Sequence, residues 1–323
     1  MSLIDIEDIK LANLRISKYL KKTELVSSDK LDALMGAQIY LKPEQLQRTG
    51  SFKFRGAMSA MTMLSDEELK NGVIAFSSGN HAQGVACAAK ILKTSAVIVM
   101  PSDAPKIKIN KTKSYGAKII FYDRQNDDRE LIGQNIAKNE NRTLIKPFDD
   151  AQIIAGQGTS ALEAIDLIKD QSIEFDSAVI CASGGGLTAG SAIALKHFNK
   201  KCQIYTAEPM EWNDHELSFK KNKRLILKQR QHGLCDALES PSPGKITFEI
   251  NNNLGVKGIS VNDEAIINAM KFAYEEFNFI LEPSGAVGLA AAMKSKSLFK
   301  GKKNLIILSG GNISKNRFNQ CIA

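Results

Sequence analysis

The sequence contains no apolar run that approaches the roughly 18 residues needed to cross a membrane. Its first residues also lack the basic and then apolar pattern of a secretory signal. The five cysteines stand far apart and include no Cys-x-x-Cys pair, which argues against a disulfide framework and against a structural zinc site. We therefore expect a cytoplasmic protein that has no membrane partner.

Acidic residues are too few to balance the basic ones, and the formal charge of the 323-residue chain is +8. The lysines are nevertheless scattered, and the densest basic cluster, at residues 220–224, contains no aromatic residue. Nucleic-acid-binding surfaces are usually more extensive and are often interleaved with aromatic side chains. The cluster is more typical of a solvated helix end, so we expect no nucleic-acid partner.

From residue 73 onward, short β-branched runs alternate with amphipathic segments, a pattern that predicts parallel α/β sheets covered by helices on both faces. We predict strands at 37–41, 73–76, 96–100, 118–122, 143–146, 178–181, 203–207 and 305–308. We predict helices at 6–20, 82–92, 106–115, 128–139, 158–169, 187–198, 262–277 and 284–293. A loop that carries Lys53 is expected after the first strand. Two α/β lobes around one cleft are the simplest arrangement of these elements.

Polar or glycine-rich loops follow three of the predicted strands, with the sequences SSGNH from Ser77, ASGGGLTAG from Ala182 and SGGN from Ser309. Ligands of parallel α/β sheets bind beyond the carboxyl ends of the strands, where such loops collect. The backbone of a glycine-rich loop can wrap an anion with its N–H groups at the start of a helix. The loop with three glycines, at 184–186, is neither a Walker loop nor a G-x-G-x-x-G fingerprint, and a tight strand–helix turn also recruits glycine. By itself it leaves phosphate binding open.

Lys53 lies among small and aromatic residues in the segment TGSFKFRGA at 49–57. A lysine in apolar surroundings loses solvation of its ammonium form, so its pKa falls and its amine can act as a nucleophile. An ordinary surface lysine is the alternative. Together with a phosphate cradle and polar loops at neighbouring strand ends, such an amine suits pyridoxal phosphate, whose aldehyde forms a Schiff base with lysine.

Four segments, SFKFRGA at 51–57, SGNH at 78–81, SGGGL at 183–187 and SGGN at 309–312, carry a resemblance to a known family. In this order and spacing they resemble the threonine/serine dehydratase and serine racemase family of fold-type II pyridoxal-phosphate enzymes. The resemblance extends from about Ile16 to Asn312. It implies a two-lobed, tryptophan synthase β-like fold with a large cofactor-binding domain at 1–71 and 148–323 and a small mobile domain at 72–147. It also implies a homodimer.

The resemblance implies a role for each motif residue. Lys53 would form the Schiff base with pyridoxal phosphate and move the proton at the substrate Cα. Phe52 would pack against the pyridine ring, Asn80 would hydrogen-bond the cofactor's 3′-hydroxyl, and Ser309 would face the pyridine nitrogen. The residues around the cofactor phosphate would be Ser183, Gly184, Gly185, Gly186 and Leu187. The residues that receive the amino-acid substrate's carboxylate would be Ser77, Ser78, Gly79, Asn80 and His81.

A neutral hydroxyl at Ser309 does not enforce a protonated pyridine ring, which suits β-elimination better than reactions that need a long-lived carbanion. We therefore predict a dehydratase, or ammonia-lyase, that acts on a β-hydroxy amino acid such as L-threonine or L-serine. Loss of the β-hydroxyl would release an enamine, which hydrolyses to a 2-oxo acid and ammonia.

Three alternatives stay open. In the racemases of the family the serine at Ser78 protonates the opposite face of Cα, so an amino-acid racemase is possible, although a serine that caps the next helix explains Ser78 equally well. Arg129 aligns with an arginine that can meet a second substrate carboxylate, which would suit a 3-hydroxyaspartate dehydratase, or it is a solvated surface residue. A non-catalytic ligand-binding protein of the same fold is the third alternative, and the intact Lys53 argues against it.

A second constellation follows the predicted strand at 203–207. Glu208 and Asp214, with the backbone carbonyl of Trp212, match the family's site for a hard cation, Mg²⁺ or Ca²⁺. Acidic residues are also common on surfaces near strand ends, which is the alternative. The resemblance gives this metal a structural role near the phosphate loop.

Overall fold

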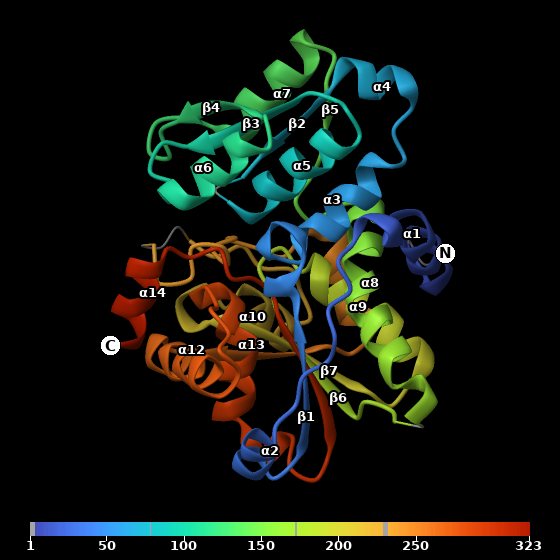
Figure 1. Ribbon diagram of the computed structural model, residues 1–323, viewed down its shortest axis with the longest axis vertical. Helices are drawn as coiled ribbons and strands as arrows, with labels where there is room; N and C mark the ends of the chain where they lie inside the picture. The colour runs from blue at the N-terminus through green and yellow to red at the C-terminus, as the bar shows by residue number, and fades with distance from the viewer. Residues whose placement is uncertain (1–3, 78, 172, 229–231) are drawn as a thin grey trace.

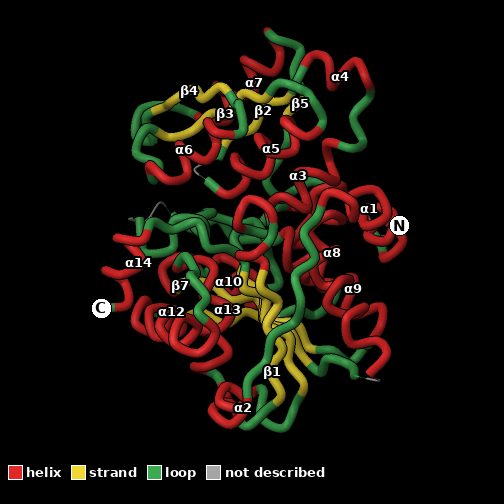
Figure 2. The backbone as a smooth tube through the Cα atoms, viewed as in Figure 1, coloured by secondary structure: helices red, strands yellow, loops and turns green. Residues whose placement is uncertain are grey.

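The computed structural model describes residues 4–77, 79–171, 173–228 and 232–323, which form two lobes that lie one above the other (Figure 1). Each lobe has its own sheet, and the strands of the two sheets form separate groups surrounded by helices (Figure 2). Within the described residues, no helix has the length and apolar character needed to span a bilayer.

The strands are β1 Gln38–Pro43, β2 Val73–Phe76, β3 Ala96–Pro101, β4 Lys118–Tyr122, β5 Thr143–Leu144, β6 Ser177–Cys181, β7 Gln203–Pro209, β8 Lys257–Val261 and β9 Lys303–Leu308. The helices of the first half are α1 Ile6–Ile16, α2 Asp29–Met35, α3 Lys53–Met61, α4 Asp66–Asn71, α5 Asn80–Ile91, α6 Lys106–Ser114 and α7 Arg129–Asn139. Those of the second half are α8 Ala151–Ile168, α9 Gly186–Phe198, α10 Asp214–Lys220, α11 Lys245–Asn253, α12 Asp263–Phe277, α13 Pro283–Lys294 and α14 Lys315–Ile322.

Both sheets are parallel. The larger has the strand order β1-β9-β6-β7-β8, and the smaller has the order β4-β3-β2-β5. The central strands are buried on both faces, as at Val179, Ile180 and Ile306, because helices cover each side of the sheet. The predicted α/β fold with parallel sheets is thus confirmed. The strands of the smaller sheet all lie within residues 72–147, and the mobility expected of that lobe stays a prediction.

Lys53 is the first residue of helix α3, so its expected position in a loop is wrong. The segment contains Gly56 and the β-region residue Ser51, which hide the helical pattern in the sequence. Glycine is required at position 56 because a Cβ there would lie 2.9 Å from the side chain of Gln157 and 3.0 Å from the carbonyl oxygen of Ile153, both on α8. Helix α3 is therefore stabilised by close packing against α8 rather than by local propensity.

Helix α8 begins at Ala151, seven residues before the predicted start at residue 158. The Asp150 carboxylate accepts hydrogen bonds from two backbone N–H groups of the first turn, which is a typical N-cap. Gly156 and Gly158 lie inside the helix, where a Cβ would clash with α3 and α9 respectively. Glycines that weaken a local helix signal are thus present because neighbouring helices come very close.

Candidate active site

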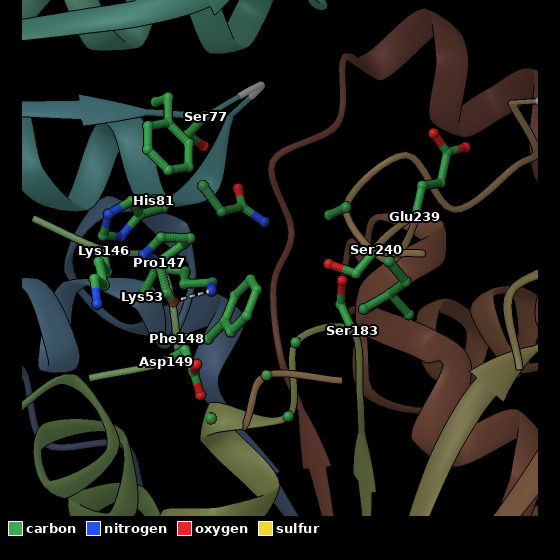
Figure 3. A pocket seen from close by; sticks show the side chains of 18 of the residues that line it. Lys53, Ser77, His81, Lys146, Pro147, Phe148, Asp149, Ser183, Glu239 and Ser240 are labelled. Atoms are coloured by element: carbon green, nitrogen blue, oxygen red, sulfur yellow. Dashed lines mark hydrogen bonds between the residues drawn. The ribbon is translucent and has the colours of Figure 1, made fainter. Parts of the chain in front are cut away.

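A cavity of about 500 Å³ lies where the loops after β2, β6 and β9 come together, and both lobes contribute to its walls. Figure 3 shows Lys53 and Phe148 on one side of it, with Ser183 and Ser240 on the other. The predicted site residues that line it are Phe52, Lys53, Ser77, Gly79, Asn80, His81, Arg129, Ser183, Gly184, Gly185, Gly186, Leu187 and Ser309. Ser78, predicted as a catalytic and substrate-binding residue, lies outside the described residues. The fold thus gathers segments that are far apart in the sequence at one cavity.

The Lys53 amine reaches this cavity from the first turn of α3. Its Nζ donates a hydrogen bond to the carbonyl oxygen of Pro147 over 2.8 Å (Figure 3) and lies 5.1 Å from the ring centroid of Phe52. Burial lowers the pKa of Lys53 to about 8. About a tenth of this amine is therefore unprotonated at pH 7, and the unprotonated form is the one that attacks an aldehyde.

The loop at 183–186 lies between β6 and α9, and its carbonyl oxygens and its backbone N–H groups differ in their hydrogen bonding. Carbonyl oxygens of this loop accept hydrogen bonds from the side chains of His215, Thr247 and Asn251. None of the four backbone N–H groups donates to another residue in the described part of the chain. Gly185 has a φ of 90°, which favours glycine. Unpaired N–H groups at a cavity and a helix start fit the phosphate of a bound cofactor.

Ser309 and Asn80 line the cavity with polar side chains that are held in different ways. Ser309 is only 5% exposed, and its hydroxyl makes a long hydrogen bond of 3.4 Å to the carbonyl oxygen of Ser284. The amide of Asn80 donates to Glu282 over 2.5 Å and accepts from Asn312 over 2.8 Å. The weak bond leaves the Ser309 hydroxyl free to turn toward a ligand, whereas Asn80 is held in one orientation.

His81 is buried and lines the cavity, and its Nε2 lies 2.9 Å from the carbonyl oxygen of Ile145. Because a carbonyl oxygen can only accept, Nε2 carries the proton of this hydrogen bond. Burial, reinforced by the nearby charge of Lys53, lowers the pKa of His81 to about 3. The imidazole is therefore neutral at physiological pH and is anchored to the backbone, an arrangement that favours positioning over proton transfer.

Arg129 is the first residue of α7 and lines the cavity from the smaller lobe. Its guanidinium carbon lies 5.6 Å from the ring centroid of Phe76, within the range of a cation–π contact. The structure therefore places Arg129 beside the cavity rather than on the open surface. A cation in this position can meet an anionic group of a ligand.

Glu208, at the end of β7, and Asp214, at the start of α10, are both fully buried. Burial and the neighbouring Asp214 carboxylate raise the pKa of Glu208, and burial raises the pKa of Asp214 to about 8. Neither carboxylate oxygen of Asp214 has a hydrogen-bond partner among the described residues. Two adjacent buried carboxylates, one of which has no hydrogen-bond partner among the described residues, fit a divalent cation with oxygen ligands.

The third expected ligand of this cation is the backbone carbonyl of Trp212, which lies in the turn between the two carboxylates and is 5% exposed. In the described ranges, no group of three or more His, Cys, Asp and Glu side chains is placed to hold a metal ion. The expected ligands include only two side chains of these types, Glu208 and Asp214, together with a backbone carbonyl, so a requirement for three such side chains does not test them. The metal site stays a prediction.

Several residues at the cavity were missed by the sequence analysis. The ring of Phe148 lies so close to the glycine loop that a Cβ on Gly184 would be 2.2 Å from it. Lys108, 2% exposed, forms ion pairs of 2.7 Å with Asp236 and 3.0 Å with Glu282. Residues 239–245 also line the cavity. No local pattern marks these positions, because long-range contacts bring them to the cavity.

A half-buried lysine that shares a cavity with a glycine loop, between two parallel sheets, is the arrangement expected of a pyridoxal-phosphate enzyme of fold-type II. Residues 16–310 match the pyridoxal-phosphate dependent enzyme family, and the chain belongs to that family. The predicted family resemblance and architecture are thus confirmed.

Relatives in this family include both ammonia-lyases and racemases. The chain is 41% identical to L-threo-3-hydroxyaspartate ammonia-lyase from Saccharomyces cerevisiae, over 96% of this chain and 94% of the relative. It is 38% identical to serine racemase from Schizosaccharomyces pombe, over 97% and 95% of the two chains. The solved structure of maize serine racemase superposes with a TM-score of 0.92 at 37% identity, covering 98% of this chain and 96% of that one.

Proposed function

We propose that this protein is a pyridoxal-phosphate-dependent ammonia-lyase that removes the β-hydroxyl and the amino group of a β-hydroxy amino acid. The observation that carries the proposal is that the Lys53 amine, the unpaired N–H groups of the loop at 183–186 and the Ser309 hydroxyl line one cavity. Those three groups are spaced along most of the chain, and together they suit the aldehyde, the phosphate and the ring nitrogen of pyridoxal phosphate.

When bound, pyridoxal phosphate supplies a conjugated ring that takes up the electron pair released at the substrate Cα. In this proposal the N–H groups of residues 183–186 bind its phosphate, Phe52 packs on its ring, and Asn80 binds its hydroxyl. The Lys53 amine, which is partly neutral because burial lowers its pKa to about 8, takes the proton from Cα. His81 stays neutral and fixed to the backbone, so it orients the loop that receives the substrate carboxylate.

The hydroxyl of Ser309 is neutral, so it does not keep the pyridine nitrogen of the cofactor protonated. This supports β-elimination over a reaction that needs a long-lived negative charge on the pyridine ring. In the net reaction the Cα–H and Cβ–O bonds break, and the hydroxyl leaves as water. Hydrolysis of the released enamine then consumes one water and gives a 2-oxo acid and ammonia. No external oxidant or reductant is needed, because Cα is oxidised while Cβ is reduced.

The position of Arg129 at the cavity wall favours the proposal that the substrate has a second carboxylate. A guanidinium at the cavity wall can bind a carboxylate in a bidentate manner, whereas the side chains of threonine and serine offer no charge to it. The relative from Saccharomyces cerevisiae is named for L-threo-3-hydroxyaspartate. We therefore place L-threo-3-hydroxyaspartate ahead of L-threonine and L-serine as the substrate.

A serine racemase is the second candidate. It is supported by the similarity to serine racemases from Schizosaccharomyces pombe and maize. It would require a base on the face of Cα opposite Lys53, the role that the family resemblance gives to Ser78.

The test is to incubate the holoenzyme with each amino acid and to measure both 2-oxo acid formation and inversion at Cα. We expect 2-oxo acid from L-threo-3-hydroxyaspartate with the highest kcat/KM, and slower formation from L-threonine and L-serine. Lys53→Ala should abolish turnover and the visible absorbance of the bound cofactor, whereas Lys22→Ala at an exposed position should change neither. A protein that takes up no pyridoxal phosphate would overturn the proposal, and inversion without 2-oxo acid would favour the racemase.

We also propose that Glu208, Asp214 and the Trp212 carbonyl bind Mg²⁺ or Ca²⁺, and that the protein is a homodimer. A cation between two buried carboxylates removes their mutual repulsion, so EDTA should lower the melting temperature of the wild type. Asp214→Asn should make the melting temperature insensitive to EDTA. An equal effect of EDTA on both proteins would rule out this cation site, and light scattering would test the dimer.

A further inference from the structure

His215 is fully buried; its ring contacts the glycine loop, and its backbone N–H donates a hydrogen bond to the carboxylate of Glu208. It is the second residue of α10, directly after Asp214. Neither the sequence motifs nor the proposed reaction assigns it a role. Its hydrogen bonds connect the proposed cofactor site at the loop of residues 183–186 with the proposed cation site at Glu208 and Asp214.

On the side of the cavity, the ring of His215 lies beneath the glycine loop. Its Nε2 donates a hydrogen bond of 2.8 Å to the carbonyl oxygen of Ser183. A Cβ on Gly185 would lie only 2.6 Å from the ring carbon Cε1, so the loop rests directly on the imidazole. The position of this ring therefore helps to set the direction in which the loop's N–H groups point.

On the opposite side, the backbone of His215 is tied to the carboxylate pair. The Glu208 carboxylate accepts the N–H of His215 through Oε1 and the N–H of Glu216 through Oε2, each over 2.8 Å. Asp214 is covalently adjacent, and its carboxylate oxygens have no hydrogen-bond partner among the described residues. Any ligand that draws Glu208 and Asp214 together also fixes the backbone that carries the imidazole.

We infer that His215 is a positioning residue that couples cation binding at Glu208 and Asp214 to cofactor binding at the loop of residues 183–186. A divalent cation at the carboxylate pair holds the start of α10, and His215 then holds the loop with its N–H groups toward the phosphate. The coupling is reciprocal by thermodynamic necessity, so the cofactor also tightens cation binding. The inference rests on the proposed cofactor and cation sites.

The experiment measures cofactor retention by the holoenzyme, read from visible absorbance after dialysis against decreasing pyridoxal phosphate with either Ca²⁺ or EDTA. For the wild type we expect Ca²⁺ to lower the Kd of pyridoxal phosphate about tenfold, a usual size for coupling between two sites. His215→Phe keeps a ring beneath Gly185 but has no N–H donor, and it should bind the cofactor more weakly and equally in Ca²⁺ and EDTA. His215→Gln, which can still donate to the Ser183 carbonyl, should recover part of the Ca²⁺ effect.

His197→Phe on α9 is the matched control, since His197 is exposed and should leave the Ca²⁺ effect unchanged. Should His215→Phe fail to fold, His215→Leu replaces it with the same expected result. A full Ca²⁺ effect in either variant would overturn the inference. A wild type that binds the cofactor equally with Ca²⁺ and EDTA would overturn the coupling alone, whereas a wild type that binds no cofactor would overturn the proposed function with it.

Discussion

Arg55 and Glu44 form a bidentate ion pair in which neither side chain is exposed to solvent. The guanidinium donates from Nε to Oε2 and from Nη2 to Oε1, each over 2.8 Å. A second carboxylate, that of Glu163 on α8, accepts from Nη2 over 3.1 Å. Arg55 lies two residues after Lys53 on α3, so these bonds hold the start of the helix that carries the candidate catalytic amine.

Replacing Arg55 with methionine should lower the free energy of unfolding by about 3–5 kcal/mol, because the buried Glu44 carboxylate would lose the partner that donates two hydrogen bonds to it. Urea denaturation followed by circular dichroism measures this loss. Lys22→Met is the control, since the Lys22–Glu24 pair has side chains that are 64% and 65% exposed and should contribute less than about 1 kcal/mol. A loss for Arg55→Met as small as that of the control would contradict the prediction.

Uptake of pyridoxal phosphate should follow the pKa of Lys53. Burial lowers that pKa from 10.5 to about 8, so the neutral fraction of the amine rises about tenfold between pH 7 and pH 9. The rate at which apoprotein acquires visible absorbance, measured by stopped flow, should rise by a similar factor and then level off. Because the folded pKa lies below the unfolded one, stability should also increase as the pH rises from about 8 to 10.5. A rate that is constant from pH 7 to pH 9 would argue against a depressed pKa.

Gly184→Ala should weaken binding of pyridoxal phosphate by about tenfold or more, equivalent to roughly 1.4 kcal/mol. The added Cβ would lie 2.2 Å from the Phe148 ring, so either the ring or the loop must move. Combining Gly184→Ala with Phe148→Ala removes the clash and should restore part of the affinity, which a double-mutant cycle quantifies. Gly233→Ala has open space around the new Cβ and is the matched control. Strictly additive effects of the two changes would show that the ring is not the obstacle.

Arg129→Met should lower kcat/KM for L-threo-3-hydroxyaspartate by about a hundredfold, since loss of a charged hydrogen bond costs about 1.5–3 kcal/mol. For L-serine and L-threonine, which have no second carboxylate, the change should stay within about threefold. Steady-state formation of the 2-oxo acid from each substrate measures both values. The exposed Arg317→Met serves as the control. A uniform loss across all three substrates would mean that Arg129 acts on the fold of the smaller lobe rather than on the substrate.

Much of the architecture could be predicted from the sequence because it is encoded locally. The strand at 73–76 and the strand at 118–122 have the observed bounds of β2 and β4, since short β-branched runs flanked by turn residues specify strands. The glycine loop at 183–186 was visible as a possible phosphate cradle, but only its combination with Lys53 and the other motifs favoured that use, because a tight strand–helix turn also recruits glycine. Helix α3 was missed, since its stability comes from packing against α8 rather than from its own residues.

By itself, the sequence determined the two parallel sheets, the family and the lysine that is proposed to bind the cofactor, since periodicity and motif spacing carry these features. Only the tertiary structure decided that Arg129 borders the cavity, that Phe148 packs against Gly184, and that His215 lies between the loop and two carboxylates. Each of these relationships joins residues from separate elements. Their positions depend on how helices and sheets pack, and the local sequence around a residue does not show which distant residues will contact it.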